Sequence, residues 1–297
     1  MAGIEFSQRL REQVERFGAE LLQAQEIAGI EFSQRLRRQA ERFGVELLQA
    51  QQIAAVNSTD NYHGVTTEDG SHYSADALLI ATGSRYKRLN VPGENEYIGA
   101  GVHFCATCDG PFYKGKHVAV VGGGNSATEE SLLLTKFAEQ VTILVRGGEF
   151  KATQIIQEKV LSHPKIEVRW HTEVKEFLGK DSKLNRLRVH NSQSGEEEEM
   201  PIDGVFIFIG LVPNTGFLAE SGILLDEWGF VVSGHALLHQ KKRPAGFENR
   251  DPLLLETSIP GIFAAGDVRD KSTKQVVSAA GEGGSAALMI REYLKGM

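Results

Sequence analysis

Two cysteines, Cys105 and Cys108, are separated by two residues, and no other cysteine occurs among the 297 residues of the chain. Thiols at this spacing can close a small disulfide, which accepts two electrons and exchanges with thiols of a partner protein. Three other interpretations stay open: half of a zinc site, two inert buried thiols, or a chance pairing. Zinc would need histidine ligands from elsewhere, because there is no second cysteine pair. The spacing therefore favours redox chemistry, and we predict no metal site.

An acidic residue follows the second cysteine directly, in the sequence His103-Phe-Cys-Ala-Thr-Cys-Asp109-Gly110. Asp109 is placed to donate a proton to the thiolate that leaves when a disulfide is reduced, provided that it is buried enough to hold that proton. The alternative is that Asp109 is a turn residue before Gly110. We predict three catalytic residues in this segment: Cys105, Cys108 and Asp109.

A second motif joins an apolar strand pattern to a glycine-rich turn and a helix pattern, in the sequence Val118-Ala-Val-Val-Gly-Gly-Gly-Asn-Ser-Ala127. In a GxGxxA turn the first glycine permits the tight bend, and the second lets the backbone approach a pyrophosphate. The small alanine allows close helix packing, and the helix N–H groups face the phosphates. The alternative is a structural turn that binds nothing. The motif predicts dinucleotide contacts from Gly122, Gly124, Asn125, Ser126 and Ala127.

The tip of the following strand discriminates between NAD and NADP. A carboxylate at this position normally holds the ribose 2′-hydroxyl of NAD, but here the chain reads Val145-Arg-Gly-Gly-Glu-Phe-Lys151. Arg146 and Lys151 can instead bind a 2′-phosphate, so we favour NADPH. The alternative interpretation is a solvated basic loop.

The elements that must position these motifs alternate between strands and a helix. We predict strands at residues 117–121, 141–145 and 204–209, and a helix at residues 126–137. Upstream, residues 77–80 read as a buried strand, and Asp69-Gly70 marks a turn between two short strands. This alternation favours a parallel sheet in an α/β fold.

Turn signals and a polar segment divide the chain. Pro92-Gly93 marks one linker, and a second falls at residues 227–234, where strands give way to a polar insertion. Residues 233–252 are rich in His, Lys, Arg and Pro, and we interpret them as a solvated surface loop rather than a site.

A tandem duplication opens the chain, in which residues 2–27 return as residues 28–53 with four substitutions. Apolar residues recur three or four positions apart in each copy, which predicts two similar amphipathic helices. In the second copy these residues are Phe32, Leu36, Ala40, Phe43 and Leu47. A glycine late in each copy, Gly18 or Gly44, leaves open a helix, a glycine stop and a short strand.

Composition excludes several classes of protein. A net charge of −7 and a pI near 5.8 argue against a nucleic-acid partner, because phosphate binding needs a concentrated basic surface. No apolar run approaches the length of a membrane span, and the first residues lack the apolar core of a signal peptide. We therefore expect a cytoplasmic protein with no membrane partner.

The order and spacing of the motifs resemble those of low-molecular-weight, bacterial-type thioredoxin reductases, which are class II pyridine nucleotide-disulfide oxidoreductases. The Cys105-Ala-Thr-Cys-Asp-Gly110 segment is followed closely by the glycine turn. Gly261-Ile-Phe-Ala-Ala-Gly-Asp-Val268 and Lys274-Gln-Val276 resemble the family's C-terminal flavin segment. The resemblance begins at about Gly29. It implies an α/β protein with two Rossmann-like, three-layer ββα nucleotide-binding domains.

The resemblance also implies the cofactors and partners. In this family electrons pass from NADPH to FAD, then to the disulfide, and finally to thioredoxin or a thioredoxin-like protein, usually within a homodimer. Cys108 would face the flavin, and Cys105, more exposed after a domain rotation, would attack the partner. Because the disulfide and the nicotinamide site would share one domain, one domain must rotate between steps.

Further cofactor contacts follow from the resemblance. Asp267 would contact the phosphate and ribityl portion of FAD, and residues 274–276 would lie against the isoalloxazine ring. The predicted contacts outside the glycine turn and the basic loop are Thr82, Gly83, Gly210, Gly266, Asp267, Lys274, Gln275 and Val276.

The N-terminus departs from the family. Family members begin with a strand and a GxGxxG turn that grips the FAD pyrophosphate, and nothing before Ala77 offers that pattern. We therefore predict an incomplete FAD domain. The predicted segments are 1–53, a duplicated helical segment; 54–90, part of the FAD domain; 91–228, the NADP(H)-binding domain; and 229–297, the C-terminal part of the FAD domain. Two alternatives stay open: a flavin-free remnant that only binds nucleotide, and a reductase with another donor or acceptor, such as a ferredoxin-linked or peroxiredoxin-linked enzyme.

Overall fold

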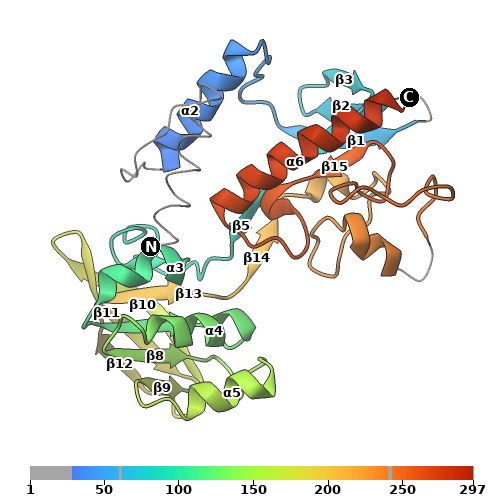
Figure 1. Cartoon of the computed structure of the whole chain (residues 1–297). Helices are drawn as coiled ribbons and strands as arrows, with labels where there is room; N and C mark the ends of the chain where they lie inside the picture. Colours follow the sequence, from blue (N-terminus) through green and yellow to red (C-terminus); the bar gives the residue numbers. More distant parts are fainter. Residues whose placement is uncertain (1–28, 60–61, 240–242, 297) are drawn as a thin grey trace, which may run out of the picture. The chain divides into compact units, whose positions relative to one another are not determined.

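The computed structural model describes residues 29–59, 62–239 and 243–296 (Figure 1). Contacts within the chain divide it into two compact units, residues 1–52 and residues 53–297. This division falls one residue before the predicted end of the duplicated segment. The larger unit contains both motifs to which the sequence assigns chemistry.

One helix, α2 (Gly29–Arg42), forms in the second copy of the duplication. It ends just before Gly44, whose φ of +79° is the left-handed conformation common after a helix. Phe43 and Leu47, which the sequence pattern assigned to the helical stripe, therefore lie beyond the helix. Residues 45–52 form no strand, so the alternative of a short strand is not observed. The first copy lies outside the described residues.

A three-stranded antiparallel sheet opens the larger unit. Its strands are β1 (Ile53–Ser58), β2 (His63–Thr67) and β3 (His72–Ala75). The turn predicted at Asp69-Gly70 joins β2 to β3 and is confirmed, with Gly70 at a φ of +85°. The Asp69 carboxylate accepts hydrogen bonds from the Thr67 hydroxyl and the Ser71 amide, at 2.6 and 3.0 Å, and so fixes the turn.

A five-stranded parallel sheet carries the glycine turn, with the strand order β6-β13-β7-β8-β9. These strands are β6 (Val102–His103), β7 (His117–Val121), β8 (Gln140–Leu144), β9 (Ile166–Arg169) and β13 (Gly204–Ile207). The predicted parallel sheet is confirmed, because every pairing within it is parallel. The strand latest in sequence, β13, lies between β6 and β7.

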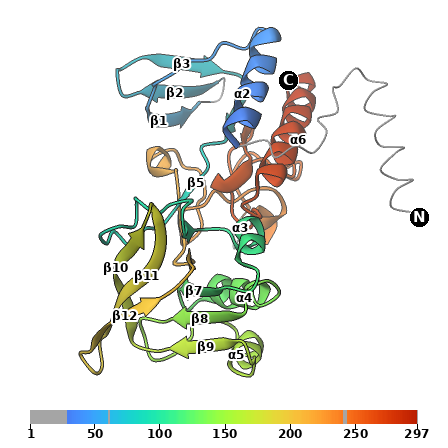
Figure 2. The same ribbon diagram turned by 90° about the vertical axis from the view of Figure 1, so that its left-hand side faces the viewer.

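Helices cover one face of this sheet and a second sheet covers the other (Figure 2). The helices are α4 (Asn125–Leu134) and α5 (Gln154–Leu161), and the antiparallel strands are β10 (Thr172–Lys180), β11 (Lys183–Asn191) and β12 (Glu197–Pro201). Successive side chains of β7 explain both layers. Val118 and Val120 pack with the helices, whereas Ala119 packs with the antiparallel sheet. This is the predicted three-layer ββα arrangement.

The chain leaves and re-enters this layered region through two adjacent segments. Strands β5 (Ser84–Tyr86) and β14 (Leu211–Pro213) pair antiparallel, and the Lys87 amide donates to the Gly210 carbonyl at 3.0 Å. Beyond β14, Leu218 and Ile223 pack in one core with Ile80 and Ile262. Residues 211–225 therefore share a core with the C-terminal segment, although the sequence placed them in the segment 91–228. Residues 227–229 form a hairpin turn rather than a linker.

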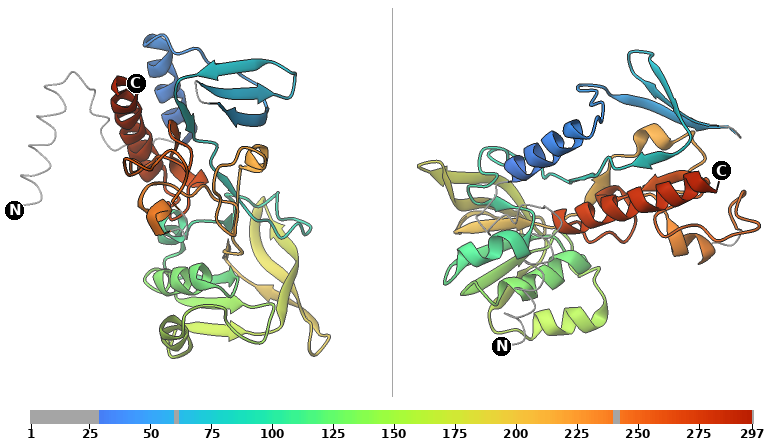
Figure 3. Two further views of the ribbon diagram at one scale, coloured as in Figure 1. Left: turned by 90° about the vertical axis from the view of Figure 1, so that its right-hand side faces the viewer. Right: turned by 45° about the horizontal axis from the view of Figure 1, so that its top comes forward.

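A long helix, α6 (Val276–Lys295), packs beside a short parallel pair of strands (Figure 3). These strands are β4 (Leu78–Ile80), which the sequence predicted, and β15 (Ile262–Ala264). Ala286 and Met289 of α6 contact Leu79 and Ala265. In the described part of the chain, none of the helices has the length and apolarity needed to cross a membrane.

Buried side chains anchor the loop at residues 233–252. Leu237, in the short helix η3 (Gly234–His239), and Phe247 are both fully buried. The Arg250 guanidinium forms two hydrogen bonds, of 2.7 and 2.6 Å, with the fully buried carboxylate of Glu256. Most described residues of the loop are exposed, as predicted, while one charged pair and two apolar side chains hold it against the core.

Candidate functional site

Cys105 and Cys108 are joined in a disulfide at the start of the short helix α3 (Ala106–Asp109). The Cys108 amide donates a hydrogen bond to Cys105 Sγ at 3.1 Å, so the first sulfur caps the helix that carries the second. Cys105 is half-buried and Cys108 is exposed. The sequence expectation that Cys105 is the more exposed sulfur applies to the arrangement after domain rotation, so it stays a prediction.

The disulfide lies beside the C-terminal segment that resembles a flavin-binding sequence. Gln275 Nε2 is 3.8 Å from Cys105 Sγ, within hydrogen-bonding range for sulfur. Phe104, next to Cys105, stacks on Tyr86 with ring centroids 5.0 Å apart. Two predicted groups of site residues, distant in sequence, are thus brought together at the disulfide.

Asp109 contacts a buried histidine. Its Oδ2 lies 3.3 Å from His103 Nδ1, and His103 Nε2 lies 2.6 Å from the hydroxyl oxygen of Tyr113 in the short helix η1 (Gly110–Tyr113). Burial lowers the pKa of His103, although the nearby Asp109 carboxylate opposes this shift. Burial, reinforced by the negative charges of Asp109 and Asp203, raises the pKa of Tyr113 to about 12. These contacts of His103 and Tyr113 could not be predicted from the sequence, because neither follows from periodicity.

The stability of the protein should decrease as the pH is lowered through the titration of His103. The folded protein holds His103 with a pKa below the usual 6.5, so the unfolded chain binds more protons near that pH. The contribution is fully present above about pH 6.5 and is lost as the pH falls. We expect a lower urea midpoint at about pH 5.5 than at about pH 7.5, and a smaller drop in His103→Phe. An equal decrease of the urea midpoint in the wild type and in His103→Phe would contradict this expectation. His63 and His117, whose pKa values burial also lowers, should retain part of the drop.

The glycine turn lies at the carboxyl end of β7, where ligands of parallel α/β sheets bind. Gly122 has a φ of +142°, and a Cβ there would collide with the carbonyl oxygen of Phe208. Gly124 precedes α4, whose first turn receives no side-chain cap, so its N–H groups remain available to an anion. Ala127 is fully buried, as close helix packing requires. Ser126 is exposed.

Replacing these two glycines should have different consequences for stability. We expect Gly122→Ala to destabilise the protein by about 2–4 kcal/mol, because the backbone conformation and the Phe208 carbonyl both resist a Cβ. Gly124→Ala has no atom within 4 Å of the added carbon, so it should unfold at nearly the wild-type urea concentration. Urea denaturation of the two variants, followed by circular dichroism, tests this difference. A Gly122→Ala midpoint equal to that of Gly124→Ala would refute it.

Asn125 and the basic loop are linked to the glycine turn through hydrogen bonds. The Asn125 side-chain oxygen accepts from the Thr153 amide at 2.8 Å, and the Lys151 amide donates to the Gly123 carbonyl at 2.7 Å. The side chains of Arg146 and Lys151 are both exposed. The loop that carries these two exposed cations therefore lies against the glycine turn, an arrangement compatible with the predicted 2′-phosphate contact.

Asp267 lies in the short helix η4 (Gly266–Val268), and its Oδ1 is buried without a hydrogen-bond partner among the described residues. Gly266 has a φ of +76°, and its amide donates to Glu282 at 2.7 Å. Arg269 holds Glu282 through hydrogen bonds of 3.1 and 2.7 Å. A buried carboxylate oxygen normally has a donor, so Asp267 has unused capacity to bind a ligand hydroxyl.

The remaining predicted contacts surround this segment. Lys274 Nζ donates to the carbonyls of Asp267 and Arg269, and it lies 4.2 Å from the centre of the Phe230 ring. Burial lowers the pKa of Lys274. The ammonium is therefore committed to the protein backbone, whereas Gln275 and Val276 are exposed.

Thr82, Gly83 and Gly210 lie at the crossing segments. The Thr82 hydroxyl donates to the Asn214 carbonyl and the Asn214 amide group donates to the Thr82 carbonyl, both at 2.8 Å. Gly83 and Gly210 have φ values of +69° and +104°. These three positions thus shape the backbone directly before β5 and directly before β14.

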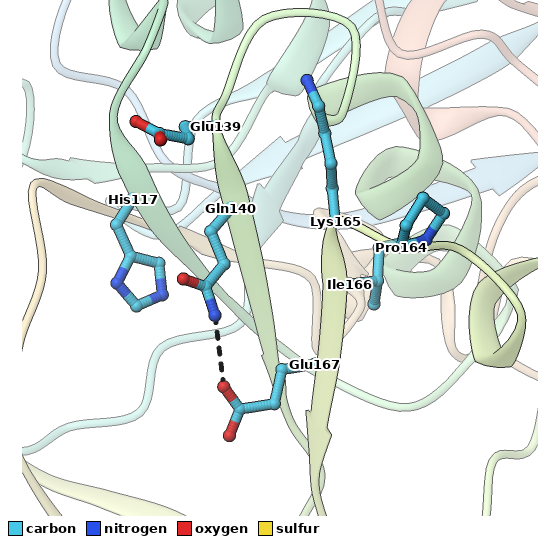
Figure 4. Close-up of a pocket in the computed structure, with 7 residues that line it drawn as sticks. All are labelled: His117, Glu139, Gln140, Pro164, Lys165, Ile166 and Glu167. Carbon is cyan, nitrogen blue, oxygen red and sulfur yellow. Dashed lines mark hydrogen bonds between the residues drawn. The ribbon is translucent and has the colours of Figure 1, made fainter.

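An open pocket of about 420 Å³ lies at the amino ends of β7, β8 and β9, at the end of the parallel sheet opposite to the glycine turn (Figure 4). It is lined by His117, Glu139, Gln140, Pro164, Lys165, Ile166 and Glu167. Gln140 donates to Glu167 at 3.3 Å, and Lys165 donates to the carbonyls of Thr135 and Ala138. Its polar groups are largely satisfied, and it lies at the amino ends of the strands. In the residues that the structure describes, no group of three or more His, Cys, Asp and Glu side chains can hold a metal ion.

Comparison with known proteins agrees with this geometry. The family model described as pyridine nucleotide-disulphide oxidoreductase matches residues 4–283. The thioredoxin reductase of Listeria innocua is 39% identical over 229 residues, which cover 77% of this chain and 66% of that protein. The chain therefore spans slightly less than two thirds of the length of this curated relative.

Solved structures give the same result. The thioredoxin reductase of Streptococcus pyogenes matches with a TM-score of 0.79 and 34% identity, over 91% of this chain and 82% of that chain. The thioredoxin reductase from Giardia duodenalis matches with a TM-score of 0.80 and 31% identity, over the same shares. These matches confirm the predicted Rossmann-like α/β fold and the resemblance found in the sequence. The chain belongs to the pyridine nucleotide-disulphide oxidoreductase family.

Proposed function

We propose that this protein is a thioredoxin-disulfide reductase that passes electrons from NADPH through FAD to the Cys105–Cys108 disulfide, and then to thioredoxin or a thioredoxin-like protein. The observation that carries the proposal is the 3.8 Å approach of Gln275 to Cys105 Sγ, because it joins the redox disulfide to the predicted flavin segment. The family match and the thioredoxin reductase relatives support the same chemistry.

The residues present fit NADPH and the ribityl side of FAD, whereas the glycine turn expected for the FAD pyrophosphate is missing from the sequence. Asp267 Oδ1, buried without a partner among the described residues, would bind a hydroxyl of the FAD ribityl chain, and Gly266 would hold the backbone turn beside it. The uncapped amino end of α4 would bind the pyrophosphate of NADPH, and Arg146 and Lys151 would bind its 2′-phosphate. When bound, FAD would supply a two-electron carrier between the nicotinamide and the disulfide.

The chain's own residues would manage the disulfide. Two-electron reduction breaks the Cys105–Cys108 bond, and Asp109 supplies a proton to one of the sulfurs. The resulting thiolate then attacks the partner's disulfide, and exchange releases the partner as a dithiol. Cys105, the sulfur expected to attack the partner, is half-buried in this form, whereas Cys108 is exposed. A change in structure must therefore make Cys105 accessible.

The glycine turn and the disulfide belong to the same layered region, which is connected to the rest of the unit by two segments. We propose that these segments, residues 87–91 and 208–210, are the hinges of a domain rotation. The nicotinamide-binding domain would then comprise residues 91–207, and the flavin-binding part would comprise residues 54–90 and 211–297. Assembly as a homodimer and a location in the cytoplasm complete the proposal.

Flavin retention tests this function most directly. The purified chain is incubated with excess FAD, free cofactor is removed by gel filtration, and the visible spectrum is recorded. We expect about one equivalent of bound flavin that bleaches when NADPH is added, followed by reduction of thioredoxin. A chain that retains no flavin would refute the proposal and favour a protein that only binds nucleotide. Bleaching by a different donor would identify a reductase of another specificity.

A further inference from the structure

Three hydrogen-bonding side chains extend from the cysteine pair into the core. Asp109, directly after Cys108, has a side chain that is 31% exposed, and it contacts His103, whose side chain is 9% exposed. His103 in turn contacts the buried hydroxyl of Tyr113. The series therefore begins at a carboxylate in contact with solvent and ends at a phenol inside the domain.

Close packing fixes the position of the imidazole. The rings of His103, Tyr113 and Phe206 have centroids 5.2–5.5 Å apart. Gly204 of β13 lies against the Tyr113 ring, where a Cβ would overlap ring atoms. A side chain held on two sides by aromatic rings and at both nitrogens by polar partners has little freedom to rotate.

Hydrogen-bond chemistry assigns the tautomer. Burial lowers the pKa of His103, so the imidazole is neutral at neutral pH, with one N–H and one acceptor nitrogen. Nδ1 faces a carboxylate, which only accepts, so Nδ1 carries the proton and donates to Asp109 Oδ2. Nε2 then accepts from the hydroxyl of Tyr113, whose pKa of about 12 keeps it protonated.

We propose that His103 and Tyr113 are positioning residues that orient Asp109 as the acid and base of the Cys105–Cys108 pair. His103 Nδ1–H holds Oδ2 in both protonation states of Asp109, which leaves Oδ1 to carry the proton that is exchanged with sulfur. The inference rests on the proposed function in one respect only, which is that reduced flavin is the natural reductant of the disulfide.

Reduction of the disulfide consumes two electrons and one proton. The two electrons break the S–S bond, and the Oδ1 proton of Asp109 goes to one sulfur, giving one thiol and one thiolate. The Asp109 carboxylate then takes a proton from water through its exposed edge. The donated hydrogen bond from Nδ1 is strongest when Asp109 is ionised, so it stabilises the state formed by proton transfer.

Other charged groups surround the three side chains. Lys116 Nζ lies 5.6 Å from the centre of the Tyr113 ring, and the negative charge of Asp203 also acts on the Tyr113 hydroxyl. Tyr86 of β5 is close enough to Asp109 for its pKa to be raised by burial and by the negative charges of Asp267, Glu130 and Asp109. These are the charged and titratable groups that face the three side chains from neighbouring elements.

The test uses the oxidised full chain without added cofactors. Dithiothreitol reduces the disulfide, the reaction is stopped by alkylation, and the rate is divided by the concentration of dithiothreitol thiolate between about pH 5 and about pH 9. We expect Asp109→Asn to lower the corrected rate, because the amide cannot supply a proton to the leaving sulfur. His103→Phe should lower the corrected rate about tenfold, and Tyr113→Phe should act in the same direction with a smaller effect.

A double-mutant cycle separates positioning from a purely structural role. In an Asp109→Asn background, His103→Phe should change the rate by less than about twofold. The control His117→Phe, at a half-buried histidine that contacts Thr142, should keep the wild-type profile. Equal effects of His103→Phe with and without Asp109, or no effect at all, would overturn the inference.

If His103→Phe fails to fold, Tyr113→Phe serves in the same cycle, because it removes only a hydroxyl. A chain that retains no FAD still gives this profile, so failure of the proposed function is recognised separately.

Discussion

Cys108→Ser is expected to abolish the reduction of thioredoxin by NADPH, with a loss of more than about a thousandfold. The variant removes one sulfur of the disulfide that joins the two halves of the proposed electron path, and serine oxygen cannot form or exchange a disulfide. Cys105→Ser should cause a loss of the same order, since neither sulfur can accept two electrons alone. The measurement is NADPH-dependent reduction of thioredoxin, monitored by its free thiols.

Two comparisons give this result its meaning. Flavin bleaching by NADPH should be unchanged in both serine variants, because that step precedes the disulfide. Thr107→Ala, at the exposed position between the cysteines, should reduce thioredoxin at nearly the wild-type rate. If either serine variant kept more than about a tenth of the activity, the disulfide would not be the route of the electrons.

Arg250→Met is expected to cause the largest loss of stability among the charged surface-loop residues, about 3 kcal/mol. Glu256 is fully buried, and its carboxylate is satisfied by Arg250 together with the amides of Leu253 and Gly261, at 2.9 and 3.0 Å. Removing the guanidinium leaves a buried charge with two backbone donors. The Arg250 guanidinium also lies 4.9 Å from the centre of the Phe247 ring, so the variant loses a cation–π contact.

Arg243→Met is the matched control, since it removes the same kind of side chain from the same loop. Arg243 pairs with Asp251, but their side chains are 45% and 65% exposed. We expect it to cost less than about 1 kcal/mol, as is usual for exposed ion pairs. The free energy of unfolding, measured by urea denaturation, should therefore separate the two variants. If both cost the same, burial of Glu256 is not what anchors the loop.

Local signals in the sequence were sufficient for several parts of this molecule. The alternation of apolar residues predicted β7, β8, α4 and the parallel sheet, and the glycine spacing predicted the turn between β7 and α4. The spacing of Cys105 and Cys108 predicted a disulfide that the structure contains. These features depend on residues a few positions apart, so the periods of strands and helices and the geometry of a short loop determine them.

Other features depend on distant packing. Leu218 and Ile223, which precede the linker predicted near residue 227, pack with Ile262 of the C-terminal segment. The loop at residues 233–252 is largely exposed, as its polar composition predicts, but Leu237 and Phe247 are fully buried. Neither composition nor turn signals report which hydrophobic core receives a side chain.

The sequence by itself determined the kind of chemistry, the elements beside each motif and the family, because these are written in residue types at short spacings. Only the tertiary structure brought Gln275 to Cys105, across 170 positions of the chain, and placed His103 between Asp109 and Tyr113. Contacts of this kind depend on how sheets and helices pack together, and burial then lowers the pKa of the imidazole between its two partners.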